Sequence, residues 1–239
     1  MKIEVLQDPE AVAKKAAAVI AEAARAAVAA RGRFTIAVSG GNTPWVMLRE
    51  LGKESIPWQK VHVLQVDERI APAGDPDRNL THLHESLLEH APLRREQIHA
   101  MPVEASDLEA ATRQYTEILR KLGGSPVQLD LVHLGLGPDG HTASLIPGDP
   151  VLDIMDREVA LTGVYQGRRR MTITYLVINQ ARQILWVVTG GEKAGMLVRL
   201  CGADKSIPSG RVSQEHAELL ADRAAAAQLD QSGSQATAS

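Results

Sequence analysis

The feature that most constrains the fold is a repeated order of apolar segment, glycine-containing turn and helix-forming segment. Residues 34–38 form a short β-branched run, and glycines follow at 40–41. The same order returns at 129–141 and at 184–191. Parallel strands need long crossover connections, which are usually helices. We therefore expect an α/β protein with a mostly parallel, Rossmann-like sheet and helices on both faces.

Local signals place the individual elements. Asp8 and Pro9 open the first predicted helix, since an aspartate caps free N–H groups and proline needs none at the first helical position. Helices are predicted at residues 9–30, 79–90 and 106–122, and after the glycines at 40–41 and 190–191. Strands are predicted at residues 34–38, 61–66, 98–103, 129–136, 171–178, 184–188 and 217–221. We expect residues 1–227 to form a single α/β domain and the small, polar residues 228–239 to form a disordered tail.

Charge and composition narrow the classes of partner. The net charge is only −3, so no global basic field exists to collect nucleic acid, and an anion must be held by a local cluster. No apolar run approaches the ~20 residues that span a bilayer, which predicts no membrane partner. A single cysteine, Cys201, and an N-terminus without a secretory pattern favour a cytoplasmic protein. We expect a monomer or a weak homo-oligomer.

Polar, glycine-rich segments follow several predicted strands, at residues 39–43, 67–69, 137–144 and 189–193. In an open α/β sheet, ligands bind beyond the carboxyl ends of the strands. The convergence of these segments predicts a binding site at that edge.

The first of these segments follows a strand and opens a helix. Glycine lets the backbone approach an anion closely, and the N–H groups of a helix start attract negative charge. A tight strand-to-helix turn with no ligand is an equally good explanation. The candidate anion-binding residues are Ser39, Gly40, Gly41, Asn42 and Thr43.

The third segment contains a candidate general base. His141 lies on a turn among small and hydroxyl residues, and imidazole suits proton transfer from water near neutral pH. Asp139 is close enough in sequence to orient its ring. The alternative is a histidine that only braces the loop, whereas His133, inside an apolar strand, is expected to be a core histidine. Residues 135–140 also match the dinucleotide pattern GxGxxG, but the prolines that follow break the helix that such a loop must open.

Charged residues complete the candidate site. Asp67 and Arg69 end a predicted strand, where Arg69 can clamp an anion and the carboxylates can accept hydroxyl groups or orient an arginine. A solvated loop is the plainer explanation. At least one of the three arginines at 168–170 is expected to face the site, and Lys193 adds a point charge at another strand-to-helix turn.

Taken in order, these segments resemble the 6-phosphogluconolactonase family over residues 34–225. The most specific block ends in His-Thr-Ala-Ser-Leu at 141–145. The other segments that carry the resemblance lie at residues 39–44, 67–69, 130–140, 170–172 and 190–193. The family usually has Ser where Arg78 stands and Phe where Ile146 stands, and these departures affect substrate detail more than reaction class.

The resemblance implies a fold similar to glucosamine-6-phosphate deaminase and ribose-5-phosphate isomerase, with no metal or other cofactor. It implies hydrolysis of a small-molecule sugar-phosphate lactone, 6-phospho-D-glucono-1,5-lactone, in the oxidative pentose phosphate pathway. His141 would be the catalytic histidine, and Arg69, Arg170 and Lys193 would hold the phosphate beside the glycine loop. No Gly-x-Ser-x-Gly nucleophile elbow is present, which disfavours a serine hydrolase.

Two other functions fit parts of the pattern. An amino-sugar-phosphate deaminase or isomerase shares the glycine loop and the Asp-Gly-His turn, but that class resembles this chain less at Arg69 and at residues 142–144. A non-catalytic sugar-phosphate sensor would keep the pocket without needing His141. The presence of His141 together with Arg69 and Lys193 favours the enzyme.

Overall fold

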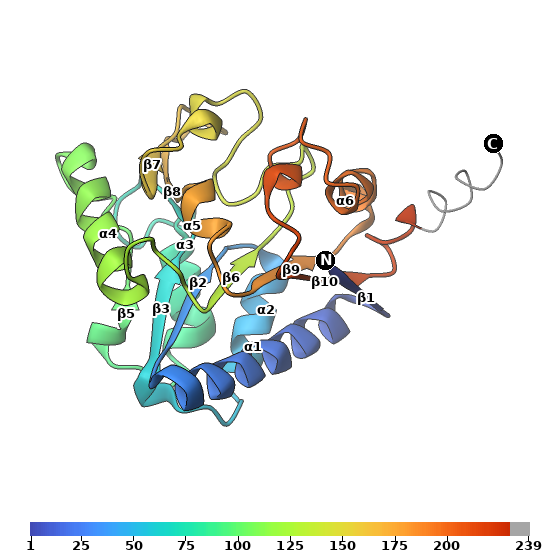
Figure 1. The fold of residues 1–239 in the computed structure, drawn as a ribbon, viewed down its shortest axis with the longest axis horizontal. Coiled ribbons are helices and arrows are strands. Elements are labelled where there is room, and N and C mark those ends of the chain that lie inside the picture. The colour runs from blue at the N-terminus through green and yellow to red at the C-terminus, as the bar shows by residue number, and fades with distance from the viewer. Residues whose placement is uncertain (230–239) are drawn as a thin grey trace.

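The computed structural model describes residues 1–229 and is built around a seven-stranded sheet in the order β1-β10-β9-β6-β2-β3-β5 (Figure 1). All neighbouring strands in this sheet run parallel. The strands are β1 (Lys2–Leu6), β2 (Phe34–Val38), β3 (Val61–Gln65), β5 (Ile98–His99), β6 (Leu131–Leu134), β9 (Ile184–Val188) and β10 (Ala217–Asp222). The fold class predicted from the sequence is confirmed.

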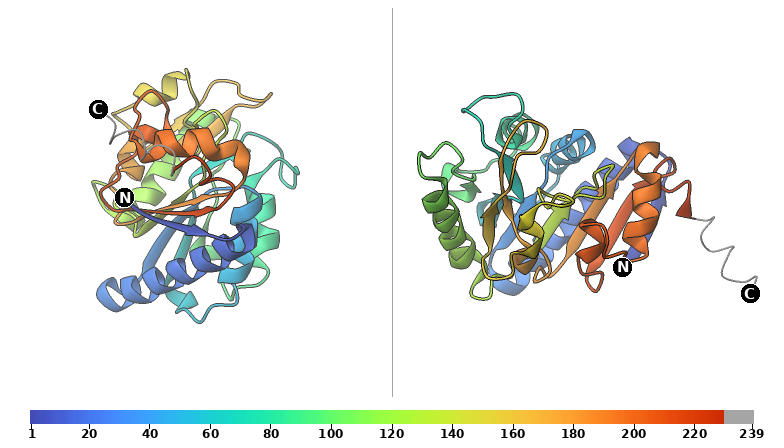
Figure 2. Two further views of the ribbon diagram at one scale, coloured as in Figure 1. Left: turned by 90° about the vertical axis from the view of Figure 1, so that its right-hand side faces the viewer. Right: turned by 90° about the horizontal axis from the view of Figure 1, so that it is seen from above.

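Helices cover both faces of the sheet. Figures 1 and 2 show α1 (Pro9–Arg31) and α2 (Asn42–Leu51) on one face, and α4 (Leu108–Gly123), α5 (Tyr175–Ile178) and α6 (Ala194–Cys201) on the other. A short α3 (Asn79–Leu83) continues into a π-helical turn, His84–Leu88, beside α2.

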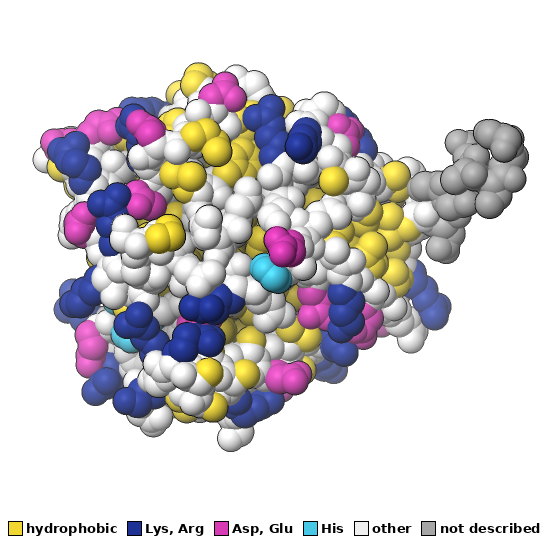
Figure 3. Space-filling model, in the orientation of Figure 1, with side chains coloured by type: hydrophobic (Ala, Val, Ile, Leu, Met, Phe, Trp, Pro, Cys, Tyr) yellow, Lys and Arg dark blue, Asp and Glu magenta, His cyan; other side chains and the backbone are white. Residues whose placement is uncertain are grey.

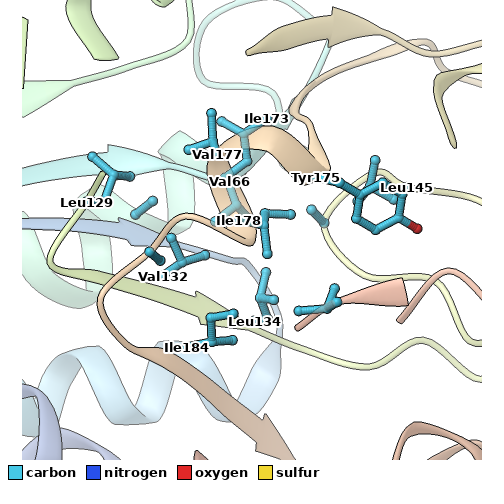
Figure 4. Packing of buried hydrophobic residues seen from close by; sticks show 14 of the residues in the cluster. Val66, Leu129, Val132, Leu134, Leu145, Ile173, Tyr175, Val177, Ile178 and Ile184 are labelled. Atoms are coloured by element: carbon cyan, nitrogen blue, oxygen red, sulfur yellow. The ribbon is translucent and has the colours of Figure 1, made fainter. Parts of the chain in front are cut away.

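The strands alternate their side chains between two apolar clusters. Ile36 and Val38 of β2 pack with α1 and α2, whereas Ala37 belongs to the cluster under α4, α5 and α6. Figure 4 shows this second cluster at α5, where Val177 and Ile178 meet side chains of the central strands. Because both faces are covered, β2 and β9 are buried along their whole length, and Thr35 is the one polar residue in the two strands.

Helix α1 begins and ends as its sequence predicts. The Asp8 side chain accepts a hydrogen bond from the Ala11 N–H at 2.9 Å, with Pro9 in the first turn. Gly32 ends the helix in the left-handed conformation, at φ 74°, which glycine adopts without a steric penalty. The strands predicted at residues 34–38 and 184–188 are confirmed to the residue.

A second, antiparallel sheet was not predicted. It has three strands in the order β4-β8-β7, formed by β4 (Asp67–Arg69), β8 (Arg170–Ile173) and β7 (Val159–Leu161). Its register sets Arg69 opposite Arg170. The charged triplet at 67–69, expected to follow a strand as a loop, is therefore itself a strand.

Two strand predictions differ from the structure, and one further strand was missed. The strand predicted at 171–178 is wrong beyond Ile173, because the chain turns at Thr174 and forms α5. The strand predicted at 98–103 is reduced to Ile98–His99, and the edge strand β1 was not predicted. The predicted disordered tail at 228–239 lies outside the described residues from position 230 onward.

Within residues 1–229, no helix has the length and apolar character needed to cross a bilayer.

The chain order creates a switch point at the middle of the large sheet. From β2 the chain continues to β3 and β5 on one side, then returns to β6 on the other side of β2 and continues to β9 and β10. Such a reversal opens a crevice beyond the carboxyl ends of the two strands where ligands bind. Here those strands are β2, which ends before Ser39, and β6, which ends before Gly135.

Candidate functional site

A cavity of about 300 Å³ lies at this switch point. It is bounded by the segments that follow β2, β6 and β9, which are neighbours in the sheet. Of the residues predicted from the sequence, those that line it are Ser39, Gly40, Gly41, Asn42, Thr43, His141 and Lys193. The predicted convergence of distant segments on one edge is therefore confirmed.

A second cavity of about 290 Å³ continues from the first and shares Gly41 and Asn42 with it. Arg69 and Arg170 line this second cavity together with Trp45 and His82. The two cavities form one elongated site, with His141 and Lys193 in the first part and the arginines in the second.

The glycine loop is held by a contact with the buried strand β6, and backbone N–H groups at its end are free to donate. The Ser39 N–H donates to Nδ1 of the fully buried His133 at 3.2 Å. Gly41 is the N-cap of α2 at φ 129°, and no side chain caps the helix. Among residues 1–229, the N–H groups of Asn42 and Thr43 have no acceptor, so the start of α2 presents free donors beside the cavity. The Thr43 hydroxyl meets that of Thr189 at 2.6 Å.

His141 is presented by a tight glycine turn. The Gly137 N–H donates to the His141 carbonyl at 2.8 Å, and Gly140 has a φ of 86°. A Cβ atom on Gly137 would collide with the His141 ring, so this position requires glycine. The glycines of the GxGxxG pattern therefore position a histidine and do not open a helix.

Asp139 orients the His141 ring. Its Oδ1 lies 2.5 Å from His141 Nδ1 and also accepts the His141 backbone N–H at 3.1 Å. Its Oδ2 accepts a hydrogen bond from the Tyr165 hydroxyl at 2.9 Å. Within the described part of the chain, His141 Nε2 has no hydrogen-bond partner, and the His141 side chain remains 21% exposed. With Nδ1 donating to the carboxylate, Nε2 carries the lone pair, which is the arrangement that a general base needs.

The same contacts keep Asp139 ionised. Partial burial acts to raise its pKa, but hydrogen bonds from His141 and Tyr165 and the charge of His141 outweigh that effect. The pKa of Asp139 is therefore below its usual value, and the carboxylate stays a hydrogen-bond acceptor near neutral pH.

The two arginines opposite each other in the small sheet differ in their partners. Arg69 donates to Asn79 Oδ1 at 2.5 Å and to the Asp77 carbonyl at 3.1 Å. Arg170 is only 5% exposed, and its Nε has no hydrogen-bond partner in the described part of the chain. Burial lowers the pKa of Arg170, and the positive charge of Arg69 adds to the effect. A buried, incompletely paired guanidinium beside a second arginine favours an anion in the cavity between them.

The arginine triplet divides between structure and site. Arg168 makes ion pairs with Asp75 at 3.0 Å and with Asp77 at 2.8 Å. Arg169 donates to the Thr162 carbonyl and does not line either cavity. Arg168 also lines the second cavity, but its charge is balanced by the two aspartates, whereas Arg170 lines that cavity and makes no ion pair within residues 1–229.

Asp67 lies behind the wall of the site. Its side chain is 4% exposed, accepts the Ser144 hydroxyl at 2.6 Å, and accepts from Asn79 Nδ2 at 3.2 Å. It lines neither cavity. Asp67 therefore ties the loop after His141 to α3.

Sequence reasoning missed three residues of the site. Tyr165 comes from the β7–β8 hairpin, Thr189 reaches Thr43 from the end of β9, and His133 supports the glycine loop from inside β6. A polar side chain inside the otherwise apolar β6, one residue before the strand ends, was the signal available for His133.

The face of the molecule drawn in Figure 3 has mixed charge. Figure 3 shows Lys and Arg side chains interspersed with Asp and Glu side chains and forming no continuous basic surface. The capacity to hold an anion is therefore local to the glycine loop, Lys193 and the two arginines.

Comparisons with known proteins identify the family of the chain. Residues 7–221 match the family model described as glucosamine-6-phosphate isomerases/6-phosphogluconolactonase. A 6-phosphogluconolactonase from Synechocystis sp. is 34% identical over 225 residues, which cover 92% of this chain and 93% of the relative.

Solved structures share the fold. A 6-phosphogluconolactonase from Thermotoga maritima has a TM-score of 0.82 at 24% identity, covering 92% of this chain and 98% of the other. A monomeric glucosamine-6-phosphate deaminase has a TM-score of 0.82 at 20% identity, covering 95% and 99%. The match of the family model over most of the chain, together with the Synechocystis relative, means that the chain belongs to the glucosamine-6-phosphate isomerase/6-phosphogluconolactonase family.

Proposed function

We propose that this chain hydrolyses 6-phospho-D-glucono-1,5-lactone to 6-phospho-D-gluconate, a step of the oxidative pentose phosphate pathway. The observation that carries the proposal is the pairing of His141 with Asp139 at 2.5 Å, with His141 Nε2 left unpaired on a ring that lines the cavity. The 6-phosphogluconolactonase names of relatives that match most of the chain support the same substrate.

In the proposed mechanism, His141 activates water. Nε2 takes a proton from a water molecule as the water oxygen bonds to C1 of the lactone. The bond between C1 and the ring oxygen then breaks, and the protonated imidazole returns the proton to that oxygen. One water is consumed and no covalent enzyme intermediate forms. Asp139 keeps the tautomer and stabilises the imidazolium. General acid–base catalysis by a side chain such as His141 typically contributes ~10²–10⁴-fold.

Phosphate binding supplies orientation. The glycine loop, with the free N–H groups of Asn42 and Thr43, and the cations Lys193, Arg69 and Arg170 surround the elongated cavity. Holding a distal phosphate there keeps C1 within reach of one imidazole, which lowers the entropic part of the barrier. Developing charge on the carbonyl oxygen is stabilised by backbone N–H groups of the glycine turns. Asp67 supports this arrangement indirectly, through Ser144 and Asn79.

The deaminase or isomerase alternative needs a base to move a proton between neighbouring carbons of the sugar. The Asp67 carboxylate is occupied by Ser144 and Asn79 and lines neither cavity. The site therefore supports hydrolysis better than isomerisation. Turnover of glucosamine-6-phosphate faster than lactone opening would favour the alternative.

The function is tested by a lactonase assay coupled to the preceding dehydrogenase and corrected for spontaneous hydrolysis. His141→Ala is expected to lower kcat by at least ~10²-fold, because the general base is lost. His216→Asn is the matched control, since its side chain is 61% exposed and outside both cavities. Full turnover in His141→Ala would contradict the role of His141.

Charge removal separates binding from chemistry. Lys193→Met is expected to raise KM for the phosphorylated lactone far more than for an unphosphorylated one, because the lost interaction is with the phosphate. Equal effects on both substrates would contradict the phosphate role of Lys193.

A further inference from the structure

Tyr165 is held in place by a rigid hairpin turn. It opens the two-residue turn between β7 and β8, in which Gln166 and Gly167 both have positive φ, at 50° and 79°. The Tyr165 N–H donates to the Arg168 carbonyl at 2.9 Å, and the Arg168 N–H donates back at 3.2 Å. Positive φ at both central residues defines the type I′ turn, whose twist matches that of paired strands. The backbone of Tyr165 is therefore fixed relative to β8.

The Tyr165 side chain touches both functional parts of the site. Its hydroxyl donates to Asp139 Oδ2 at 2.9 Å. Its ring meets His141 edge-on, with centroids 5.6 Å apart and an interplanar angle of 66°. The guanidinium carbon of Arg170 lies 5.0 Å from the centre of the same ring. One side chain thus bridges the proposed base pair and a proposed phosphate ligand.

We propose that Tyr165 is a positioning residue of the reaction, whose hydroxyl fixes the Asp139 carboxylate and whose ring fixes the Arg170 guanidinium. This inference rests on the proposed function. It separates the two parts of the side chain: the hydroxyl acts on the chemical step through Asp139, and the ring acts on substrate binding through Arg170.

The hydroxyl is the sole partner of one carboxylate oxygen. Among residues 1–229, Asp139 Oδ1 accepts from His141 twice, and Oδ2 accepts from Tyr165 alone. Without that donor, the carboxylate is held through Oδ1 alone, so its orientation, and with it the direction of the imidazole, is less restricted. Burial and the bond to Asp139 raise the pKa of Tyr165, so the phenol remains a donor throughout the neutral range.

The ring restrains a cation that is short of partners. Arg170 has one further side-chain contact, a 3.3 Å hydrogen bond to Gln166 Oε1, and its Nε is unpaired and buried. An arginine over an aromatic face is attracted by the negative charge of the ring face, and the attraction is stronger where the pair is desolvated. The ring therefore keeps the guanidinium extended toward the second cavity.

Tyr165→Phe removes only the hydroxyl and tests the first half. We expect kcat to fall roughly tenfold, with KM nearly unchanged, since a displacement of a catalytic group below 1 Å already costs this much. Without the Tyr165 hydroxyl, the Asp139 carboxylate stabilises a proton on His141 more strongly. His141 must lose this proton to act as a base, so the acid limb of the kcat/KM profile moves to higher pH. A purely structural loosening of the hairpin would not move that limb.

Tyr165→Leu removes the ring as well and tests the second half. We expect the kcat loss of Tyr165→Phe plus a roughly two- to fivefold rise in KM for the phosphorylated lactone, from the lost cation–π contact. Tyr175→Phe is the matched control. Its hydroxyl donates to the Pro208 carbonyl at 2.8 Å, away from both cavities, so kcat and the acid limb stay at the parental values.

Two results would overturn the inference. If Tyr165→Phe keeps the parental kcat and acid limb, the hydroxyl does not position Asp139. If Tyr165→Phe raises KM and leaves kcat unchanged, the hydroxyl acts on binding and the division of roles is wrong. Thermal unfolding of each variant verifies that the measured protein is folded. Failure of the proposed function is distinguishable, because the parental protein would then lack lactonase activity altogether.

Discussion

Arg78 is a buried cation that is connected to the candidate site through Glu68 and Asn79. Its side chain is 2% exposed, and its Nε lies 3.1 Å from Oε2 of Glu68, which is fully buried. Glu68 also accepts the backbone N–H groups of Asn79 and Leu80, each at 2.8 Å. The pair therefore joins β4, which carries Arg69, to α3, whose Asn79 holds Arg69. The sequence resemblance leads one to expect serine at position 78, and this chain has the buried Arg78–Glu68 ion pair there instead.

Arg78→Ser is expected to lower the free energy of unfolding by about 3 kcal/mol, because it leaves the Glu68 carboxylate buried without its cation. Urea denaturation at neutral pH measures the change. Adding Glu68→Gln to Arg78→Ser should recover part of the loss. Arg157→Ser, at the exposed Arg157–Asp156 pair, is the control and should leave stability nearly unchanged. A loss in Arg78→Ser no larger than in this control would show that the buried pair contributes little.

Single residues were predictable where local pattern carries their role. His141 and Asp139 are two positions apart on a glycine turn, so the sequence allowed their pairing to be proposed, and the structure shows the contact itself. Tyr165 is 26 positions from Asp139 and lies beside a run of arginines with no glycine loop of its own. Its contact depends on how the small sheet folds over the large one, which local pattern does not encode.

At the scale of elements, apolar runs were predicted well and polar strands were not. β2, apolar except for Thr35, and the wholly apolar β9 were placed to the residue. β4 consists of Asp67, Glu68 and Arg69, whose low β-propensity is overcome by pairing with β8 and by tertiary hydrogen bonds to the carboxylates. Residues 171–178 are mostly apolar along their length, but they form a strand and then a helix. The chain leaves the sheet at Thr174, whose hydroxyl donates to the Arg157 carbonyl at 2.7 Å.

The β7–β8 turn gives a prediction for an element. Gln166 has a φ of 50°, a left-handed conformation that asparagine tolerates better than other non-glycine residues. Gln166→Asn creates the Asn-Gly pair favoured in type I′ turns and is expected to raise the free energy of unfolding by about 0.5 kcal/mol. Gln166→Val, with a β-branched side chain at positive φ, should lower it. Chemical denaturation of both variants checks the signs, and a stabilised Val variant would mean that turn strain is not the controlling term.

For the whole molecule, the alternation of strands and helices in the sequence was enough to predict a parallel sheet with two covered faces. The strand order in the structure then shows that the site lies at the switch point between β2 and β6. The second sheet was missed because β7 and β4 have three residues each. Strands this short give too few positions for a periodic pattern, and they form only where long-range pairing supports them.

Buried histidines make the stability of the whole fold depend on pH. Burial lowers the pKa of His133 to about 3, and burial together with the charge of His62 lowers that of His99 to about 4. In the unfolded chain a histidine has a pKa of about 6.5. Below that pH the unfolded state therefore binds more protons than the folded state, which lowers the free energy of unfolding.

The contribution of His133 is therefore complete above about pH 6.5 and is lost as the pH falls toward 3, with a slope of up to ~1.4 kcal/mol per pH unit. His133→Asn keeps an acceptor near the position of Nδ1 for the Ser39 N–H but removes the titrating group. We expect this variant to be less stable at pH 7 and to lose less stability between pH 6.5 and 4 than the parental protein. Urea denaturation across that range measures both slopes, with His216→Asn, an exposed histidine, as the variant that should follow the parent. Parallel curves for His133→Asn and the parent would mean that the buried imidazole does not control acid unfolding.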